Sequence, residues 1–204
     1  MTEIRVGAFL CVLGCYACSS PKTEVQSPDG HIKMTLTVDE NGKPFYNVSV
    51  DDSLLIENSA MGFTAANGII LSEGFQVKNT TFSSEDETWT QPWGENKKNR
   101  NHYNEMAVSL TNEDQVQLTL RFRVFDDGIG FRYEYTVPTV DSLLITNELT
   151  TFRFHRDGTS WSIPASAETY ELLYQQQPIS EVETANTPFT FKTADGVYGS
   201  IHEA

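Results

Sequence analysis

The chain has 204 residues, of which 39% are hydrophobic and 11% aromatic, and its formal net charge at pH 7 is −14. A chain of this length folds as one sizeable domain or two small ones, and this composition fills a core and excludes disorder for most of the chain. Because the excess of acidic residues repels a polyanion, a nucleic-acid partner is excluded as a working hypothesis. After the N-terminal segment, no apolar run is long enough to cross a bilayer.

The N-terminal segment has the composition of an export signal. Arg5 precedes an apolar stretch from Val6 to Ala17, which is too short to span a bilayer and has the length of a signal-peptide core. Small residues followed by cysteine resemble a bacterial lipoprotein cleavage site, so Cys18 is the predicted acylation site and Cys15 the alternative. We therefore expect a signal peptide over residues 1–18.

Cysteine usage supports export. The three cysteines of the chain all lie in this leader, so no disulfide framework or thiolate zinc site is available downstream. A buried N-terminal strand with incidental cysteines is the alternative. We expect a linker over residues 19–24 and a folded domain over residues 25–204. The expected location is the periplasm or outer membrane of a Gram-negative bacterium, with a lipid anchor as the only contact with the membrane.

The residues that follow show the two-residue period of β-strands. Apolar side chains alternate with polar ones from Ile32 to Val38, before a turn that ends at Gly42. A longer alternation from Val116 to Val124 leads into the turn Asp126-Asp127-Gly128 and a returning strand over residues 129–137. No window of helical length has helical spacing. Many short strands separated by turns indicate an all-β fold, a large antiparallel sandwich.

Residues 85–105 lack this alternation and are polar and aromatic. A segment of this length without periodic structure inside a compact domain is typical of a functional loop. It also gathers Lys97, Lys98, Arg100 and His102, a positive patch on an acidic protein.

The aromatic and hydrogen-bonding residues of this segment are candidates for carbohydrate binding. Trp89 and Trp93 either stack on a sugar ring or pack into the core. Arg100, Asn101 and His102 either donate hydrogen bonds to hydroxyl or carboxylate groups, or Arg100 ties the loop to the acidic surface.

Carboxylate pairs are the next candidates, because glycoside hydrolysis needs one protonated and one ionised carboxyl group beside the bond. Glu95 and Glu105 bracket much of the unusual segment, with solvated loop residues as the alternative, whereas Asp126 and Asp127 are interpreted as turn residues. Neither a Gly-x-Ser-x-Gly motif, a metal-binding histidine spacing nor a phosphate-binding glycine loop occurs. These residues alone assign no catalytic group.

The C-terminal residues predict one more hairpin. Residues 187–191 and 197–201 read as two strands around the turn Asp195-Gly196, after which the chain closes with His202-Glu203-Ala204. By itself, Glu203 is interpreted as solvated surface.

Five short strings, in this order, resemble the N-terminal domain of glycoside hydrolase family 97, and the resemblance covers about residues 24 to 204. The strings are Ser27-Pro28-Asp29-Gly30, Trp93-Gly94-Glu95 followed by Arg100-Asn101-His102-Tyr103-Asn104-Glu105, Phe125 through Tyr133, Thr187-Pro188, and His202-Glu203-Ala204. The resemblance implies a galactose-mutarotase-like β-supersandwich. In this family of exported bacterial exo-acting α-glucosidases and α-galactosidases, the sandwich packs on a catalytic (β/α)8 barrel that has no counterpart in this chain.

The resemblance also implies a metal site and partners. The family's sandwich supplies one calcium ligand from the His-Glu-Ala string, which maps onto Glu203. Because calcium takes six to eight oxygen ligands, Glu203 alone would bind negligibly and the barrel would complete the site. The implied partners are this barrel and an α-linked oligosaccharide, and Trp93, Glu95, Arg100, Asn101 and His102 are the candidates to face it. We expect the 204-residue chain to be a fragment of a longer enzyme and inactive alone.

Two rival hypotheses remain. One is a standalone carbohydrate-binding outer-membrane lipoprotein that uses Trp89, Trp93 and the segment around Arg100 as its sugar surface. The other is a structural sandwich module that mediates assembly at the outer membrane.

Overall fold

The computed structural model of the protein describes residues 23–138 and 140–203. The expected signal peptide, with Cys15 and Cys18, lies outside the described residues. Strand β1 begins at Glu24, the last residue of the segment expected to be a linker. Within the described part of the chain, no helix has the length and apolar character needed to cross a membrane.

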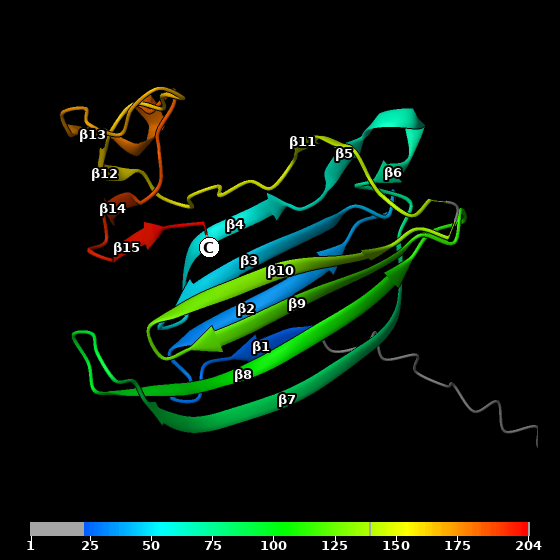
Figure 1. The fold of residues 1–204 in the computed structure, drawn as a ribbon, viewed down its shortest axis with the longest axis horizontal. Helices are drawn as coiled ribbons and strands as arrows, with labels where there is room; N and C mark the ends of the chain where they lie inside the picture. The colour runs from blue at the N-terminus through cyan, green and yellow to red at the C-terminus, as the bar shows by residue number, and fades with distance from the viewer. Residues whose placement is uncertain (1–22, 139, 204) are drawn as a thin grey trace, which may run out of the picture.

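Two four-stranded antiparallel sheets form the body of the molecule and pack face to face (Figure 1). The first has the order β1-β2-β3-β4, with β1 at Glu24–Gln26, β2 at Ile32–Val38, β3 at Pro44–Val50 and β4 at Ser53–Ala60. The second has the order β10-β9-β8-β7, with β7 at Gln76–Thr90, β8 at Lys98–Thr111, β9 at Gln117–Phe125 and β10 at Gly128–Thr136. The predicted all-β antiparallel sandwich is confirmed, as are its hairpins β2–β3 and β9–β10.

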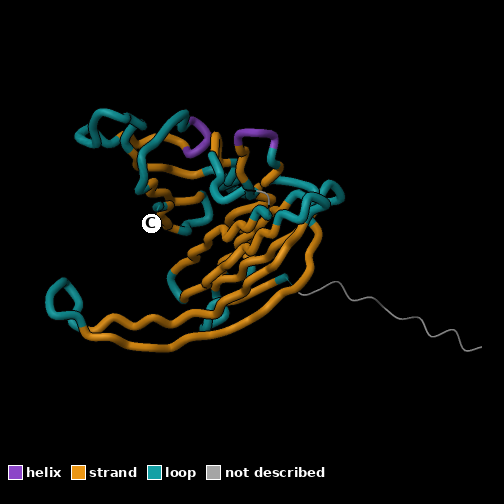
Figure 2. The backbone as a smooth tube through the Cα atoms, turned by 45° about the vertical axis from the view of Figure 1, so that its right-hand side comes forward, coloured by secondary structure: helices purple, strands orange, loops and turns teal. Residues whose placement is uncertain are grey.

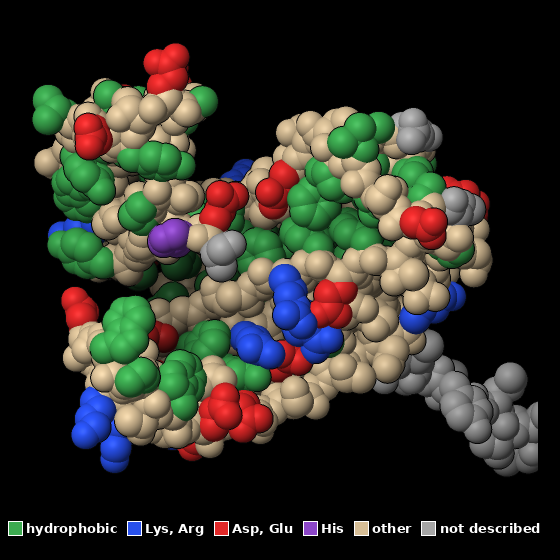
Figure 3. Space-filling view, in the orientation of Figure 1, with side chains coloured by type: hydrophobic (Ala, Val, Ile, Leu, Met, Phe, Trp, Pro, Cys, Tyr) green, Lys and Arg blue, Asp and Glu red, His purple; other side chains and the backbone are tan. Residues whose placement is uncertain are grey.

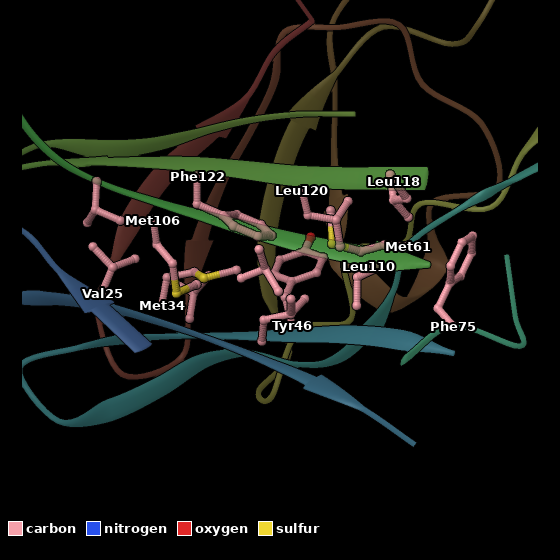
Figure 4. Packing of buried hydrophobic residues seen from close by; sticks show 14 of the residues in the cluster. Val25, Met34, Tyr46, Met61, Phe75, Met106, Leu110, Leu118, Leu120 and Phe122 are labelled. Carbon is pink, nitrogen blue, oxygen red and sulfur yellow. The ribbon is translucent and has the colours of Figure 1, made fainter. Parts of the chain in front are cut away.

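The core lies between the inner faces of these two sheets. Strand β9 alternates buried and partly exposed residues along its length, as the sequence predicts, and Phe122 opposes Met106 of β8 in the register. Figure 4 shows Phe122 and Met106 meeting Met34 of the other sheet, with Tyr46 farther along the same layer. Burial of these apolar side chains is the main force that holds the two sheets together.

Two smaller sheets complete the fold. The three-stranded sheet has the order β11-β5-β6, with β11 at Ile145–Glu148, β5 at Phe63–Ala65 and β6 at Ile70–Leu71. The four-stranded sheet has the order β13-β12-β14-β15, with β12 at Gly158–Ser162, β13 at Gln175–Pro178, β14 at Phe189–Thr193 and β15 at Tyr198–Ile201. Two short 3-10 helices, Ala66–Gly68 and Ile179–Glu181, lie in the connections. The predicted C-terminal hairpin is therefore confirmed as β14–β15.

We call residues 158–203 the C-terminal lobe. Figures 1 and 2 both show it at one end of the sandwich, joined to it by an extended segment after β11. Phe154 of this segment forms an isolated β-bridge with Ile56 of β4, and its ring lies 4.7 Å from the ring of Phe191 in β14. The aromatic contact fixes the lobe against the edge of the first sheet.

The expectation of a long loop over residues 85–105 is wrong. Strands β7 and β8 run through this segment in antiparallel register from Ser83↔Glu105 to Thr90↔Lys98, and only residues 91–97 form a loop. The alternation is missing because both faces of β7 are exposed over residues 81–90, so neither face selects apolar residues. The strands are held by their ladder hydrogen bonds and by contacts across the hairpin.

Candidate functional site

The outer part of the β7–β8 hairpin extends beyond the sandwich, and we call residues 84–104 the projecting hairpin (Figure 2). At its tip, Gln91 N–H donates to the carbonyl of Lys97 at 3.1 Å, and the Gln91 side-chain amide donates to the carbonyl of Asn96 at 2.8 Å. These bonds close the tip around Trp93, whose side chain is 85% exposed. The hairpin thus presents an aromatic ring to solvent on a fixed support.

The structure brings most of the candidate residues of this segment together on the projecting hairpin. Trp89 is 50% exposed on β7, so neither it nor Trp93 packs into the core, which removes that alternative for both. Glu95 lies exposed in the tip loop beside Trp93. A shallow hollow at the tip is lined by Thr90, Gln91, Pro92, Trp93, Gly94 and Lys97.

Arg100 is paired within the hairpin. Its Nε and Nη2 donate to the two carboxylate oxygens of Asp86 at 2.7 and 2.8 Å. This two-point hydrogen bond raises the pKa of Arg100 and lowers the pKa of Asp86. Asn101 likewise donates to Glu87 Oε1 at 3.0 Å. Both cross-strand contacts hold β7 to β8, so Arg100 ties the segment to an acidic side chain, as its alternative interpretation predicted.

His102 lies at the base of the projecting hairpin. Its Nδ1 is 3.6 Å from Oδ2 of Asp126, in the β9–β10 turn, and has no hydrogen-bond partner among the described residues. The other carboxylate oxygen of Asp126 accepts the backbone N–H of Asp29 at 2.9 Å. Asp126 therefore is a turn residue, as predicted, and links two turns at this end of the sandwich.

Glu105 is part of an ion network rather than a solvated loop. Its side chain, only 10% exposed, accepts hydrogen bonds from Arg121 and from Arg123 Nε, the latter at 2.8 Å. Burial by itself would raise the pKa of Glu105, but the two arginines hold it below its usual value. Arg121 also pairs with Glu134 of β10, so the network spans β8, β9 and β10 on the outer face of the sheet.

Glu203 lies two residues beyond the end of β15 and is exposed. Strand β15 is held by β14 through the pairs Phe189↔Ile201 to Lys192↔Tyr198. Among residues 23–138 and 140–203, no group of three His, Cys, Asp or Glu side chains is placed to hold a metal ion. Glu203 is therefore an exposed carboxylate just beyond the last strand of the lobe.

The projecting hairpin and the C-terminal lobe extend on the same side of the molecule in both ribbon views (Figures 1 and 2). The C-terminal end of the described chain lies between them. Figure 3 shows that the surface is hollowed there, between the lobe and the hairpin. We take this hollow, flanked by the Trp93 tip and the Glu203 end of β15, as the candidate functional site.

The sequence reasoning missed one exposed feature of the C-terminal lobe. The loop between β12 and β13 presents Tyr170, Leu173 and Tyr174 to solvent. The signal is an apolar cluster, Tyr-Glu-Leu-Leu-Tyr, that fits neither the strand period nor the helix period.

The fold defines a class of protein, a β-supersandwich domain with a projecting hairpin. Residues 25–204 match the family model described as Glycosyl-hydrolase 97 N-terminal, and the chain therefore belongs to this family, as the resemblance in the sequence indicated.

Similar proteins support this assignment. A glycoside hydrolase family 97 enzyme from Pseudoalteromonas sp. strain K8, solved in complex with panose and also with acarbose, has a TM-score of 0.81 and 38% sequence identity. The match covers 89% of this chain and 28% of that chain. A retaining alpha-galactosidase from Bacteroides thetaiotaomicron is 28% identical over 125 residues, which are 61% of this chain and 18% of the relative. A beta-arabinopyranosidase structure shares the fold, with a TM-score of 0.73 and 24% identity over 83% of this chain and 29% of that chain.

Proposed function

We propose that the chain is the active-site-completing N-terminal domain of an exported, calcium-dependent α-glycosidase, and that it has no catalytic activity alone. The observation that carries the proposal is the exposed carboxylate of Glu203 on the short segment that follows β15, in a chain whose residues 25–204 match the N-terminal domain of this family. The chain spans less than a third of the relatives that it matches. The catalytic carboxyl groups would therefore belong to the part of the enzyme outside this match.

Calcium would supply positive charge that orients and polarises groups in the active site. Glu203 would hold it through a carboxylate oxygen, which is the ligand type that calcium prefers. Its exposure leaves the carboxylate accessible to an ion shared with a second domain.

The projecting hairpin would contact the sugar. Trp93 offers an exposed ring face for stacking, and Glu95 beside it offers hydrogen-bond acceptors. Arg100 and Asn101 are engaged by acidic side chains of β7, so their main effect would be to keep the hairpin in shape. An α-linked oligosaccharide is the proposed substrate class, and panose is a suitable probe because a 38% identical relative binds it.

The experiment compares two proteins. One is the 204-residue chain, and the other, the joined protein, is this chain fused in frame to the part of the Pseudoalteromonas enzyme that follows the match. We expect the joined protein, but not the chain alone, to hydrolyse a p-nitrophenyl α-glycoside in a calcium-dependent way. Glu203→Gln should weaken calcium binding to the joined protein at least tenfold by titration calorimetry, while Glu113→Gln, in the exposed β8–β9 turn, should not. Hydrolysis by the chain alone, or equal calcium affinity in both variants, would contradict the proposal.

Export is part of the same proposal. We expect Cys18 to be the acylated N-terminus of the mature protein, which mass spectrometry of the N-terminal peptide tests directly. An unprocessed Met1, or an acylated Cys15, would contradict this assignment.

A second candidate is a standalone carbohydrate-binding lipoprotein, which the exposure of Trp89 and Trp93 favours. It requires saturable binding of panose to the 204-residue chain, lost in Trp93→Ala. Absence of binding with the fold intact would exclude it for this sugar.

A further inference from the structure

We propose, building on the function above, that the β12–β13 loop, residues 163–174, is a docking surface for the remaining part of the enzyme. Four of the five residues from Tyr170 to Tyr174 are large apolar side chains that face solvent, with exposed fractions of 71% for Tyr170, 39% for Leu172, 89% for Leu173 and 65% for Tyr174. Single exposed apolar residues are ordinary on a protein surface, but a contiguous run of this kind marks an interaction site.

Side-chain hydrogen bonds to the backbone shape the middle of the loop. Ser166 Oγ accepts the backbone N–H groups of Glu168 and Thr169 at 3.2 and 3.4 Å, and Thr169 Oγ1 accepts the N–H of Glu171 at 3.0 Å. These side-chain turns lie at the start of the apolar run. A preshaped loop loses less entropy when it binds a partner.

The sheet topology places this loop at the same end of the lobe as Glu203. Strand β12 ends at Ser162 opposite the start of β13, and the pair Trp161↔Thr190 puts the start of β14 at this end as well. The pair Phe189↔Ile201 then brings the end of β15 to the same side, two residues before Glu203. A body that shares a metal ion with Glu203 would therefore lie at the end of the sheet where the loop also lies.

The chemistry of the loop favours protein over sugar as the partner. Sugar sites combine aromatic faces with hydrogen-bonding groups, and leucine offers neither, so Leu172 and Leu173 suit an apolar protein surface. The lobe also carries a strong charge bias. Its only lysine or arginine is Lys192, whereas its acidic residues are Glu168, Glu171, Glu181, Glu183, Asp195 and Glu203. The partner surface should therefore be an apolar patch bordered by lysine and arginine.

The rest of the enzyme is the occupant that the comparisons favour. Because the match covers only 28% of the Pseudoalteromonas chain, most of that enzyme lies outside the sandwich. This larger part is the natural candidate to pack against an exposed apolar surface of the sandwich. A second copy of this chain would bring like charges together around the loop, which disfavours self-association.

Hydroxyl-radical footprinting tests the proposal without any variant. Tyr170, Leu173 and Tyr174 should be oxidised at least threefold more slowly in the joined protein than in the 204-residue chain. Leu144, which is 69% exposed near β11 and away from the lobe, is the matched control and should react equally in both. Equal oxidation of the loop in the two proteins would overturn the proposal.

Substitutions provide an independent readout. Leu173→Asp should split the thermal unfolding of the joined protein into two transitions and leave that of the 204-residue chain unchanged, whereas Leu144→Asp should alter neither. Protection of Tyr170 and Tyr174 by panose in the 204-residue chain would instead make the loop a sugar site and overturn docking. Since footprinting requires no hydrolysis, an inactive joined protein with a protected loop would refute the proposed function alone, and an active one with a reactive loop would refute docking alone.

Discussion

The ion network on the outer face of the β7–β10 sheet leads to a prediction with a defined pH range. Glu134 accepts hydrogen bonds from Arg121 at 2.9 and 3.1 Å and from Arg132 at 2.8 Å. These contacts, of which those from Arg121 contribute most, lower the pKa of Glu134 from 4.5 to about 2. Glu134→Gln removes the charge that makes them strong and keeps the size of the side chain.

The pKa sets the magnitude. Each pKa unit corresponds to about 1.4 kcal/mol, so the lowered pKa gives an upper limit of about 3 to 4 kcal/mol for the contribution of Glu134 to the free energy of unfolding. The Glu134 side chain is 36% exposed, and solvent screening reduces this to about 1 kcal/mol. For a domain of this size, such a loss lowers Tm by about 2 to 4 °C.

The pKa direction gives the sign of the pH dependence. Because the folded pKa of Glu134 lies below its unfolded value, its stabilisation is present above about pH 4.5 and disappears as the pH falls towards about 2. The wild-type chain should therefore lose more stability than Glu134→Gln between about pH 5 and pH 2.

Urea unfolding followed by circular dichroism over this pH range is the assay. Glu113→Gln makes the same charge change in the exposed β8–β9 turn and should follow the wild type. If Glu134→Gln matches the wild type at neutral pH, or if the two lose stability in parallel on acidification, the ion pairs of Glu134 do not stabilise the fold.

Three further predictions concern the core, a close approach of strands and the hairpin tip. Phe122→Ala should lower the free energy of unfolding by about 3 to 5 kcal/mol in urea titrations, because Phe122 is fully buried between the sheets. Gly158→Ala should lower Tm, because its Cβ would lie 2.1 Å from the carbonyl oxygen of Lys192, whereas Gly130→Ala, with open space at the Cβ position, should leave Tm nearly unchanged. Trp93→Ala should change stability by less than about 0.5 kcal/mol, since the ring is solvent-exposed, and should lower kcat/KM of the joined protein at least tenfold if the ring stacks on the sugar.

The parts of the fold that have one buried face could be predicted from the sequence. Strand β9 alternates because one of its faces meets the core, and its tight turn to β10 follows from Asp126-Asp127-Gly128. Strand β7 could not be predicted in its outer half, because no core selects its residues there. The information that makes residues 85–90 a strand lies in their partners on β8, such as Arg100 for Asp86, and not in any local period.

The candidate site, like the fold, could be predicted from the sequence only in part. The residues of the projecting hairpin could be singled out by their composition, and Glu203 by its resemblance to a family string. Their placement around one hollow depends on how the C-terminal lobe sits on the sandwich, and the contact of Phe154 with Phe191 is one of those that hold it there. Neither residue has a sequence feature that indicates its partner 37 positions away.

The ion network on the outer face of the sheet also helps to set the direction of the projecting hairpin. The tip has no core beneath it, so its direction is set where β8 leaves the sheet. There Tyr103 packs on Phe125 with ring centroids 5.3 Å apart, the Arg123 guanidinium lies 4.4 Å from the Tyr103 ring centroid, and Arg123 in turn holds Glu105. Glu105 therefore connects the ion network to the base of the projecting hairpin, whose tip carries Trp93. A substitution at Glu134 lowers the free energy of unfolding but acts on β10, away from the hairpin. A substitution at Glu105 would instead weaken the contacts at the base of the projecting hairpin, so that Trp93 would lie at the hollow for a smaller fraction of the time.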